Sequence, residues 1–155
     1  MNLSILYNDL GRYGEAKKLI KVSPENAKAS RSVLDPFIRS KLANKHAEVA
    51  DWYAGVGAFD EAVAEYRQAL KLEETYADLR TSLAVCLREK GDLKGALEEL
   101  LKATKTSPQY VDAHIQLGLT HYTLGKKAEA VKVWKSAVKK FPANETVKMY
   151  LALAK

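Results

Sequence analysis

The sequence contains a single cysteine, Cys86, and only four prolines among its 155 residues. One cysteine cannot form a disulfide within the chain, which favours a reducing compartment. No stretch approaches the roughly 18 uninterrupted apolar residues that a membrane span needs. Residues 1–14 also lack the basic and apolar segments of a secretory signal. We therefore expect a cytoplasmic protein without a membrane-spanning segment.

Acidic side chains are scarce outside the middle of the chain. The net charge is +6, but residues 1–45 hold nine basic and four acidic side chains, residues 46–98 hold six and eleven, and residues 99–155 hold ten and four. Nucleic-acid binding relies on lysine and arginine along one continuous path, which the acidic middle interrupts. The charge pattern therefore disfavours nucleic acid as a partner.

A regular period runs through the rest of the sequence, because the interval from Gly57 to Gly91 recurs from Gly91 to Gly125. Each glycine is followed by an alanine five residues later, a bulky residue four further on, and a second alanine three beyond that. The residues are Ala62, Ala96 and Ala130; Tyr66, Leu100 and Trp134; and Ala69, Ala103 and Ala137. A further small column precedes the glycines at Ala50, Ala84 and Gly118.

The spacing within one period predicts a pair of helices. Apolar residues three and four apart on both sides of the glycine are typical of amphipathic helices, here of about 14 residues each. The glycine marks the point where the first helix ends and the chain reverses, which favours a left-handed backbone. The small columns let the two helices approach closely, and the bulky column fills the space between them. Each unit is therefore predicted to be a helical hairpin.

Three segments carry the full pattern: GAFDEAVAEYRQALKLEE, GDLKGALEELLKATKTSP and GKKAEAVKVWKSAVKKFP. They closely resemble tetratricopeptide repeats. The resemblance implies an all-α fold, an α-α superhelix (solenoid) of helical hairpins whose first helices line a concave, protein-binding groove. Three positions depart from the family pattern: Lys127 replaces an apolar residue, Arg80 stands where an aromatic is preferred, and Glu74 replaces a proline.

The period divides residues 36–144 into three tetratricopeptide repeats, at about 43–76, 77–110 and 111–144. Residues 145–155 continue the period for one more helix. A stack of hairpins leaves an apolar face open at its end, so we expect this helix to be a C-terminal capping helix with a polar outer side.

The N-terminal region, residues 1–35, is less regular. Residues 6–20 resemble the middle of a repeat, but their glycine, Gly11, lies too far before Gly57 to fit the period. A capping side chain followed by proline predicts two further helices. We expect a short helix at about 25–34 and a long one from Pro36 to Ala54.

The residue types that support catalysis or metal binding are few. His46 and His114 fall in one repeat column and His121 in another, and the family resemblance makes both columns packing positions. No third ligand accompanies His114 and His121 at a spacing that would support a metal. Cys86 has no histidine at an informative spacing, so we interpret it as a structural thiol. We expect no enzymatic activity, no cofactor and no metal.

The family's geometry, carried over residue by residue, predicts which side chains line the concave groove. They are Asn44, Glu48, Asp51, Asp78, Thr81, Val85, Arg88, Asp112, Ile115, Gln116, Leu119, Tyr122, Met149, Tyr150 and Leu153. The first half of this list is polar and acidic, and the second half is apolar. Grouped apolar exposure marks an interface, which predicts a partner peptide or helix with apolar anchors and one basic residue. The alternative is that tight curvature or the terminal helix buries these apolar side chains.

The inner positions also bear on the kind of partner. Family members that clamp chaperone C-terminal carboxylates use lysine, asparagine and arginine there. The corresponding residues here are Ala47, Asp51, Ser82, Asp112 and Gln116. The resemblance therefore disfavours chaperone tails, and it leaves components of secretion, motility or small-GTPase signalling open. Two other functions stay open: contact of the lysine-rich residues 126–140 with an anionic membrane or nucleic acid, and self-association through the N-terminal part.

Overall fold

The computed structural model describes residues 36–154 of the chain. The half-repeat predicted at 6–20 and the short helix predicted at 25–34 lie outside the described residues. The chain separates into two compact units, residues 1–39 and 40–155. Of the first unit only the start of one helix is described, and the packing below belongs to the second unit.

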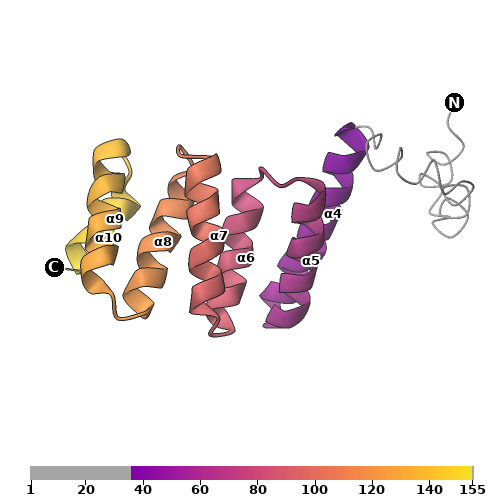
Figure 1. Cartoon of the computed structure of the whole chain (residues 1–155), viewed down its shortest axis with the longest axis horizontal. Coiled ribbons are helices and arrows are strands. Elements are labelled where there is room, and N and C mark those ends of the chain that lie inside the picture. Colours follow the sequence, from indigo (N-terminus) through magenta and orange to yellow (C-terminus); the bar gives the residue numbers. More distant parts are fainter. Residues whose placement is uncertain (1–35, 155) are drawn as a thin grey trace, which may run out of the picture. The chain divides into compact units, whose positions relative to one another are not determined.

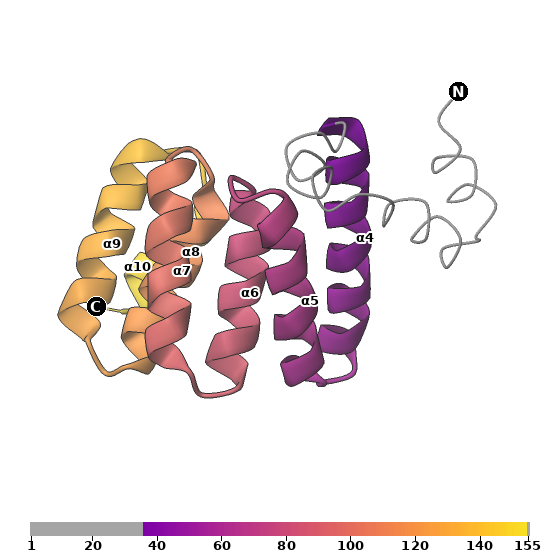
Figure 2. The same ribbon diagram turned by 45° about the vertical axis from the view of Figure 1, so that its right-hand side comes forward.

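The residues from 36 to 154 form seven helices and no strand. The helices are α4 (Pro36–Gly55), α5 (Phe59–Leu72), α6 (Ala77–Glu89), α7 (Leu93–Thr106), α8 (Val111–Thr123), α9 (Lys127–Lys140) and α10 (Glu145–Leu153). Short turns join α4 to α5, α6 to α7 and α8 to α9, and the hairpins stack side by side in chain order (Figure 1, Figure 2). This arrangement confirms the predicted all-α solenoid. The long first helix begins at the predicted Pro36.

Each hairpin turns at one of the predicted glycines. Gly57, Gly91 and Gly125 have φ angles of 78°, 86° and 74°, in the left-handed region that glycine adopts without steric cost. The Gly57 amide donates to the carbonyl three residues earlier at 3.1 Å, and the next amide donates to the carbonyl five residues before it at 2.9 Å. Both bonds recur at the other two glycines. This is the Schellman arrangement, which satisfies the last carbonyls of a helix.

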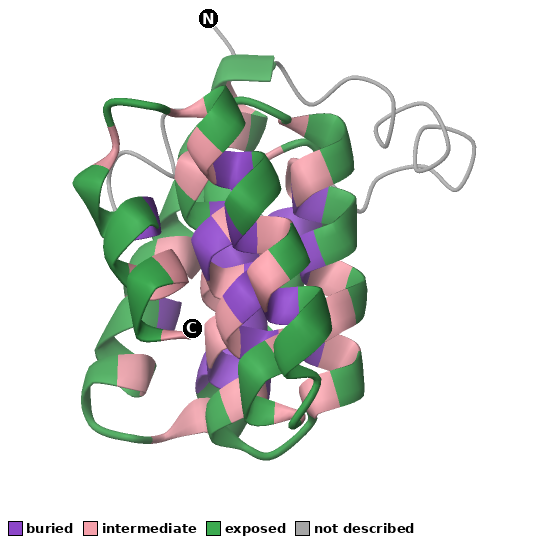
Figure 3. Ribbon diagram, turned by 90° about the vertical axis from the view of Figure 1, so that its left-hand side faces the viewer, coloured by how far each residue is buried: buried purple, intermediate pink, exposed green. Residues whose placement is uncertain are grey.

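The interior of each hairpin is filled by one large side chain against small ones. Tyr66, Leu100 and Trp134, all from second helices, are buried, as are the alanines of the predicted small columns. Figure 3 shows the buried residues gathered between the helices, while the exposed ones cover the outer sides. The predicted packing of small against large residues is therefore present in all three repeats.

The third hairpin holds the largest of these side chains, and a glycine makes room for it. The column that holds Ala50 and Ala84 in the first two repeats holds Gly118 in the third. A Cβ atom on Gly118 would overlap Nε1 and Cε2 of Trp134 and would lie 2.8 Å from Cδ1, far inside van der Waals contact. The indole N–H of Trp134 donates to the Ile115 carbonyl at 3.3 Å. The ring therefore lies directly over the backbone of α8.

The last helix, α10, begins at a side-chain cap and packs on the third hairpin. The Asn144 Oδ1 atom accepts a hydrogen bond from the Val147 amide at 3.0 Å, and Val147 is fully buried. Tyr150 stacks on the buried tryptophan, with ring centroids 5.5 Å apart. The polar outer side expected of a capping helix is only partly present, because Met149 and Leu153 are exposed. No further hairpin of the described chain covers them.

His121 in α8 is a polar defect in this packing. Its Nδ1 atom is buried without a hydrogen-bond partner. Burial, and to a smaller extent the nearby Lys126, lower the pKa of His121, while Glu129 opposes them. The corresponding residue of the second repeat is Leu87, which is buried and has no titratable group. The neutral form of His121 is therefore the one that fits the fold.

The contact between Gly118 and Trp134 predicts an inverted effect of alanine. Glycine to alanine in a helix interior ordinarily stabilises by about 1 kcal/mol. We expect Gly118→Ala to destabilise by about 1–3 kcal/mol, because the methyl group would overlap the indole. Urea unfolding measures the difference. In the Trp134→Leu background, which recreates the Ala84–Leu100 pair, the same change should cost nothing. Gly55→Ala is the control, since a Cβ there meets nothing within 4 Å; equal stability of the two alanine variants would contradict the explanation.

Protonation of His121 predicts a pH-dependent loss of stability. Because its folded-state pKa is lowered, the folded protein binds this proton less readily than the unfolded chain does. Its contribution is complete above the unfolded pKa of about 6.5 and is lost as the pH falls through the folded value. We expect His121→Leu to be more stable than wild type, with a margin that widens from pH 7.5 to pH 5. Urea unfolding across this range measures the margin, and a constant margin would count against the explanation.

Candidate partner-binding groove

The first helices of the hairpins bring the acidic part of the predicted groove together. A hollow of about 420 Å³ lies between α4 and α6. Its lining comprises Asn44, Lys45, Ala47, Glu48, Asp51, Tyr66, Asp78, Leu79 and Ser82. Four of the predicted groove residues, Asn44, Glu48, Asp51 and Asp78, therefore meet at one site.

Tyr66 is the residue of this hollow that sequence reasoning assigned only to the core. Its side chain comes from α5, is buried, and donates its hydroxyl hydrogen to Asp51 Oδ1 of α4. Burial and then this hydrogen bond raise the pKa of Tyr66 far above its usual value, and a hydrogen bond with Ser82 opposes them. The phenol therefore stays protonated and holds the Asp51 carboxylate in place. The available signal was that Tyr66 is the only hydroxyl-bearing member of its bulky column.

The other two carboxylates of the hollow, those of Glu48 and Asp78, belong to exposed residues. Lys45 Nζ contacts Glu48 Oε2 at 2.5 Å, but both side chains are at least half exposed, so water screens this ion pair. Asp78 lies in the first turn of α6 and is exposed. The hollow therefore presents its negative charge to solvent.

Arg88 is the cation predicted for the middle of the groove, and the structure gives it internal partners. Its Nη1 atom donates to Gln116 Oε1 of α8 at 2.7 Å, and its Nη2 atom lies 3.6 Å from Glu89. Only 16% of the side chain is exposed. Arg88 therefore joins α6 to α8. Val85 beside it is half-buried, and Asp112 at the start of α8 is exposed.

Two residues predicted for the groove surface are instead buried, which corrects the prediction. Thr81 of α6 is buried and donates its hydroxyl hydrogen to the Ala77 carbonyl oxygen at 2.7 Å. Ile115 belongs to the core of the last hairpin, where Val147 of α10 packs in the same cluster. Both occupy the same position in successive repeats. Close packing of the following repeat removes that position from the surface.

The other apolar groove residues divide between core and surface. Leu119 and Tyr150 are half-buried against the last core cluster. Tyr122, Met149 and Leu153 are exposed by 40%, 49% and 73%. The two alternatives for this half of the groove are therefore each right in part, and three large apolar side chains remain accessible.

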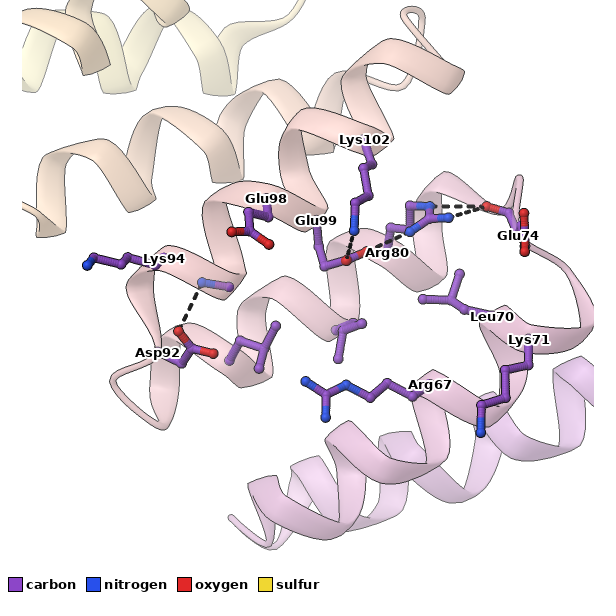
Figure 4. A pocket seen from close by; sticks show the side chains of 13 residues that line it. Arg67, Leu70, Lys71, Glu74, Arg80, Asp92, Lys94, Glu98, Glu99 and Lys102 are labelled. Atoms are coloured by element: carbon purple, nitrogen blue, oxygen red, sulfur yellow. Dashed lines mark hydrogen bonds and ion pairs between the residues drawn. The ribbon is translucent and has the colours of Figure 1, made fainter.

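A second hollow, of about 670 Å³, lies on α5, α6 and α7 and was not predicted (Figure 4). Arg80 spans it: Nε and Nη2 donate to the Glu74 carbonyl oxygen at 3.0 and 2.8 Å, and Nη1 donates to Glu99 at 2.6 Å (Figure 4). Burial opposes ionisation of Glu99, but hydrogen bonds from Lys102 and Arg80 outweigh it and lower the pKa of Glu99. These groups satisfy one another and hold the helices together.

The residues considered for chemistry have structural surroundings. Burial, followed by the charges of Asp51 and Glu89, raises the pKa of the Cys86 thiol, which is itself buried. His46 Nδ1 lies 2.6 Å from a carboxylate oxygen of Glu65. Within residues 36–154 no three potential metal ligands gather. No helix in this range is long and apolar enough to cross a membrane.

Comparison with known proteins identifies tetratricopeptide repeats in this chain. Residues 86–125 match a family model described as TPR repeat, and residues 112–144 match one described as Tetratricopeptide repeat. Small glutamine-rich tetratricopeptide repeat-containing protein 2 of Mycosarcoma maydis is 26% identical over 97 residues, which cover 63% of this chain and only 28% of that longer protein. Photosystem I assembly protein Ycf3 of Prochlorococcus marinus (strain NATL1A) is 26% identical over 146 residues, covering 83% and 78%.

The solved structures agree on the fold. The first TPR of Spaghetti (RPAP3), bound to the HSP90 peptide SRMEEVD, superposes with a TM-score of 0.68 at 22% identity, over 74% of this chain and 91% of that one. Over residues 86–144 the family matches coincide with the repeat period and with the turns at Gly91 and Gly125. Residues 86–144 of the chain therefore consist of tetratricopeptide repeats.

Proposed function

We propose that this protein is a non-catalytic scaffold that holds a partner peptide or protein in the groove formed by α4, α6, α8 and α10. The observation that carries the proposal is the division of this groove. Carboxylates gather in the hollow between α4 and α6, whereas Tyr122, Met149 and Leu153 leave apolar surface exposed at the other end. A surface with two such ends accepts a ligand in one direction only.

The charged end favours a basic side chain on the ligand. Asp51 is fixed by Tyr66, so it needs no reordering when a cation approaches. An opposite charge 4 Å away gains about 1 kcal/mol in water and about 4 kcal/mol near a protein surface. Lysine and arginine both satisfy this requirement, and arginine can bind two carboxylate oxygens at once.

The apolar end supplies the anchor. Tyr122 and Tyr150 both lie against the buried Trp134, with ring centroids 6.3 and 5.5 Å from it. Met149 and Leu153 lie one turn apart on α10 and are solvent-exposed. Rigid aromatic rings beside flexible apolar side chains are typical of surfaces that bind an amphipathic helix or an extended peptide. A groove of this size fits an affinity of roughly micromolar strength.

The relatives support a protein partner, but the peptide bound by the solved neighbour is acidic, whereas the ligand proposed here is basic. The neighbour of solved structure is bound to a peptide that carries two glutamates and one aspartate. Glu48, Asp51 and Asp78 would repel such a sequence. The name of the photosystem I assembly protein also indicates action on other proteins. Photosystem I is the target of that relative and is not proposed for this chain. The cytoplasmic location expected from the sequence remains a prediction.

Selection from a random 15-residue peptide library on the purified full chain tests the proposal. Enriched peptides are expected to combine at least one lysine or arginine with a cluster of apolar residues. The variant Glu48→Gln with Asp78→Asn should lose the preference for basic residues and bind the selected peptides about 10-fold more weakly, or 1.4 kcal/mol. Calorimetric titration of synthetic peptides measures the loss.

A matched control removes two carboxylates elsewhere. Glu61→Gln with Glu98→Gln changes the net charge equally, on exposed positions of α5 and α7. It should select the same peptides as wild type. Met149→Ser with Leu153→Ser should abolish the apolar preference and leave the melting temperature nearly unchanged, because both side chains are exposed. Identical peptides from the wild-type and Glu48→Gln, Asp78→Asn proteins would refute the proposed groove.

A further inference from the structure

The outward side of α4 carries an apolar stripe that the groove does not use. The stripe consists of Leu42, Val49, Trp52 and Val56, spaced seven, three and four residues apart. Leu42, Trp52 and Val56 are 43%, 69% and 80% exposed, and Val49 is half-buried. At 100° per residue the centre of the stripe lies roughly 120° around the helix axis from the centre of the groove residues Asn44, Glu48 and Asp51.

The internal repeats show what this side of a first helix is suited to. The residues that correspond to Trp52 are Cys86 and Thr120, which are 3% and 0% exposed. In those repeats the second helix of the preceding hairpin packs on the first helix, α5 on α6 and α7 on α8. Among the described residues, 36–154, α4 is the first helix, so no described hairpin packs on this side of it. The α4 stripe therefore exposes a face that accepts another helix elsewhere in the same array.

The α4 stripe is complementary to itself. Spacings of seven, three and four are those of the seam of a two-stranded helical pair. When two copies of α4 run antiparallel about an axis at Val49, Leu42 of each meets Val56 of the other. Lys45, the one charged residue in this spacing, falls next to Trp52 of the other copy, where an ammonium over an indole ring is favourable. Every position of the seam thus has a compatible partner.

We propose that the α4 stripe is the contact surface of a two-fold symmetric homodimer, in which α4 packs antiparallel on α4 of a second copy. A two-fold contact uses one surface twice and closes, whereas a head-to-tail contact between the two ends of the array would build open filaments. This proposal does not rest on the groove function, because the stripe residues Leu42, Val49, Trp52 and Val56 do not line the hollow; Lys45 alone lies at the edge of both surfaces.

The size of the surface indicates a reversible dimer. From Leu42 to Val56 the helix extends about 21 Å at 1.5 Å per residue. One helix pair of this length buries less than the roughly 800 Å² per partner of a standard interface. A dissociation constant on the order of micromolar is therefore expected.

Light scattering on the full-length protein between 5 and 500 μM tests the dimer. Wild type is expected to change from monomer to dimer across this range. Trp52→Glu, and separately Val56→Glu, should weaken association at least 100-fold while circular dichroism stays unchanged, since both side chains are exposed. Leu101→Glu is the matched control, because Leu101 is a 55% exposed leucine on α7, away from the stripe. It should dimerise as wild type does.

Crosslinking tests the axis. Val49→Cys places two thiols next to each other on the proposed two-fold axis, within reach of a disulfide. Mild oxidation should convert most of this variant to a covalent dimer and should leave Leu101→Cys monomeric; the native Cys86 is buried and does not compete. A wild-type monomer at 500 μM, a dimer unaffected by both glutamate variants, or no disulfide at Val49→Cys would each overturn the proposal. Acrylamide quenching of Trp52 fluorescence identifies the reason for a monomer. A monomer whose Trp52 is not quenched would also overturn the proposal, because another surface would then cover the stripe.

Discussion

The contact between the small columns and the bulky column of each hairpin sets the distance between its two helices. This contact also reaches the candidate site. Tyr66 fills the first hairpin and, through the same side chain, holds Asp51 at the groove surface. In the third hairpin Trp134 fills the core, and the rings of Tyr122 and Tyr150 lie against it. The residues that hold the hairpins together therefore also fix both ends of the groove.

Departures from the repeat pattern are compensated by contacts that follow the same period. His46 bonds a glutamate on the second helix of its hairpin, and His114 bonds the carbonyl oxygen of the residue six positions before it. Arg80 stands in the same column and makes both contacts at once, to Glu99 and to the Glu74 carbonyl. A guanidinium group has five donors and serves both acceptors, whereas a neutral imidazole has a single N–H donor. The column therefore keeps the contacts and not the residue type.

The sequence was sufficient to predict the hairpins because their determinants are local. Glycine turns, small columns and a bulky column recur once in every repeat, so each repeat supports the interpretation of the others. The groove surface was predicted less well, because exposure depends on the neighbouring repeat. Ile115 has the residue type and column of a groove residue, yet α10 buries it. Tyr66 was missed because its column indicates the core, and only the fold brings its hydroxyl to Asp51.

One column makes the dependence on neighbours explicit. Thr81 and Ile115 are buried because another repeat follows, whereas Met149 in the same column of α10 is half exposed because none follows in the described chain. At the other end the same reasoning separates Trp52 from its buried counterparts Cys86 and Thr120. The surfaces that an array offers to partners are thus its groove and the faces that an additional hairpin would cover. On α4 the groove residues and the apolar stripe point in different directions, so a ligand in the groove leaves the stripe accessible.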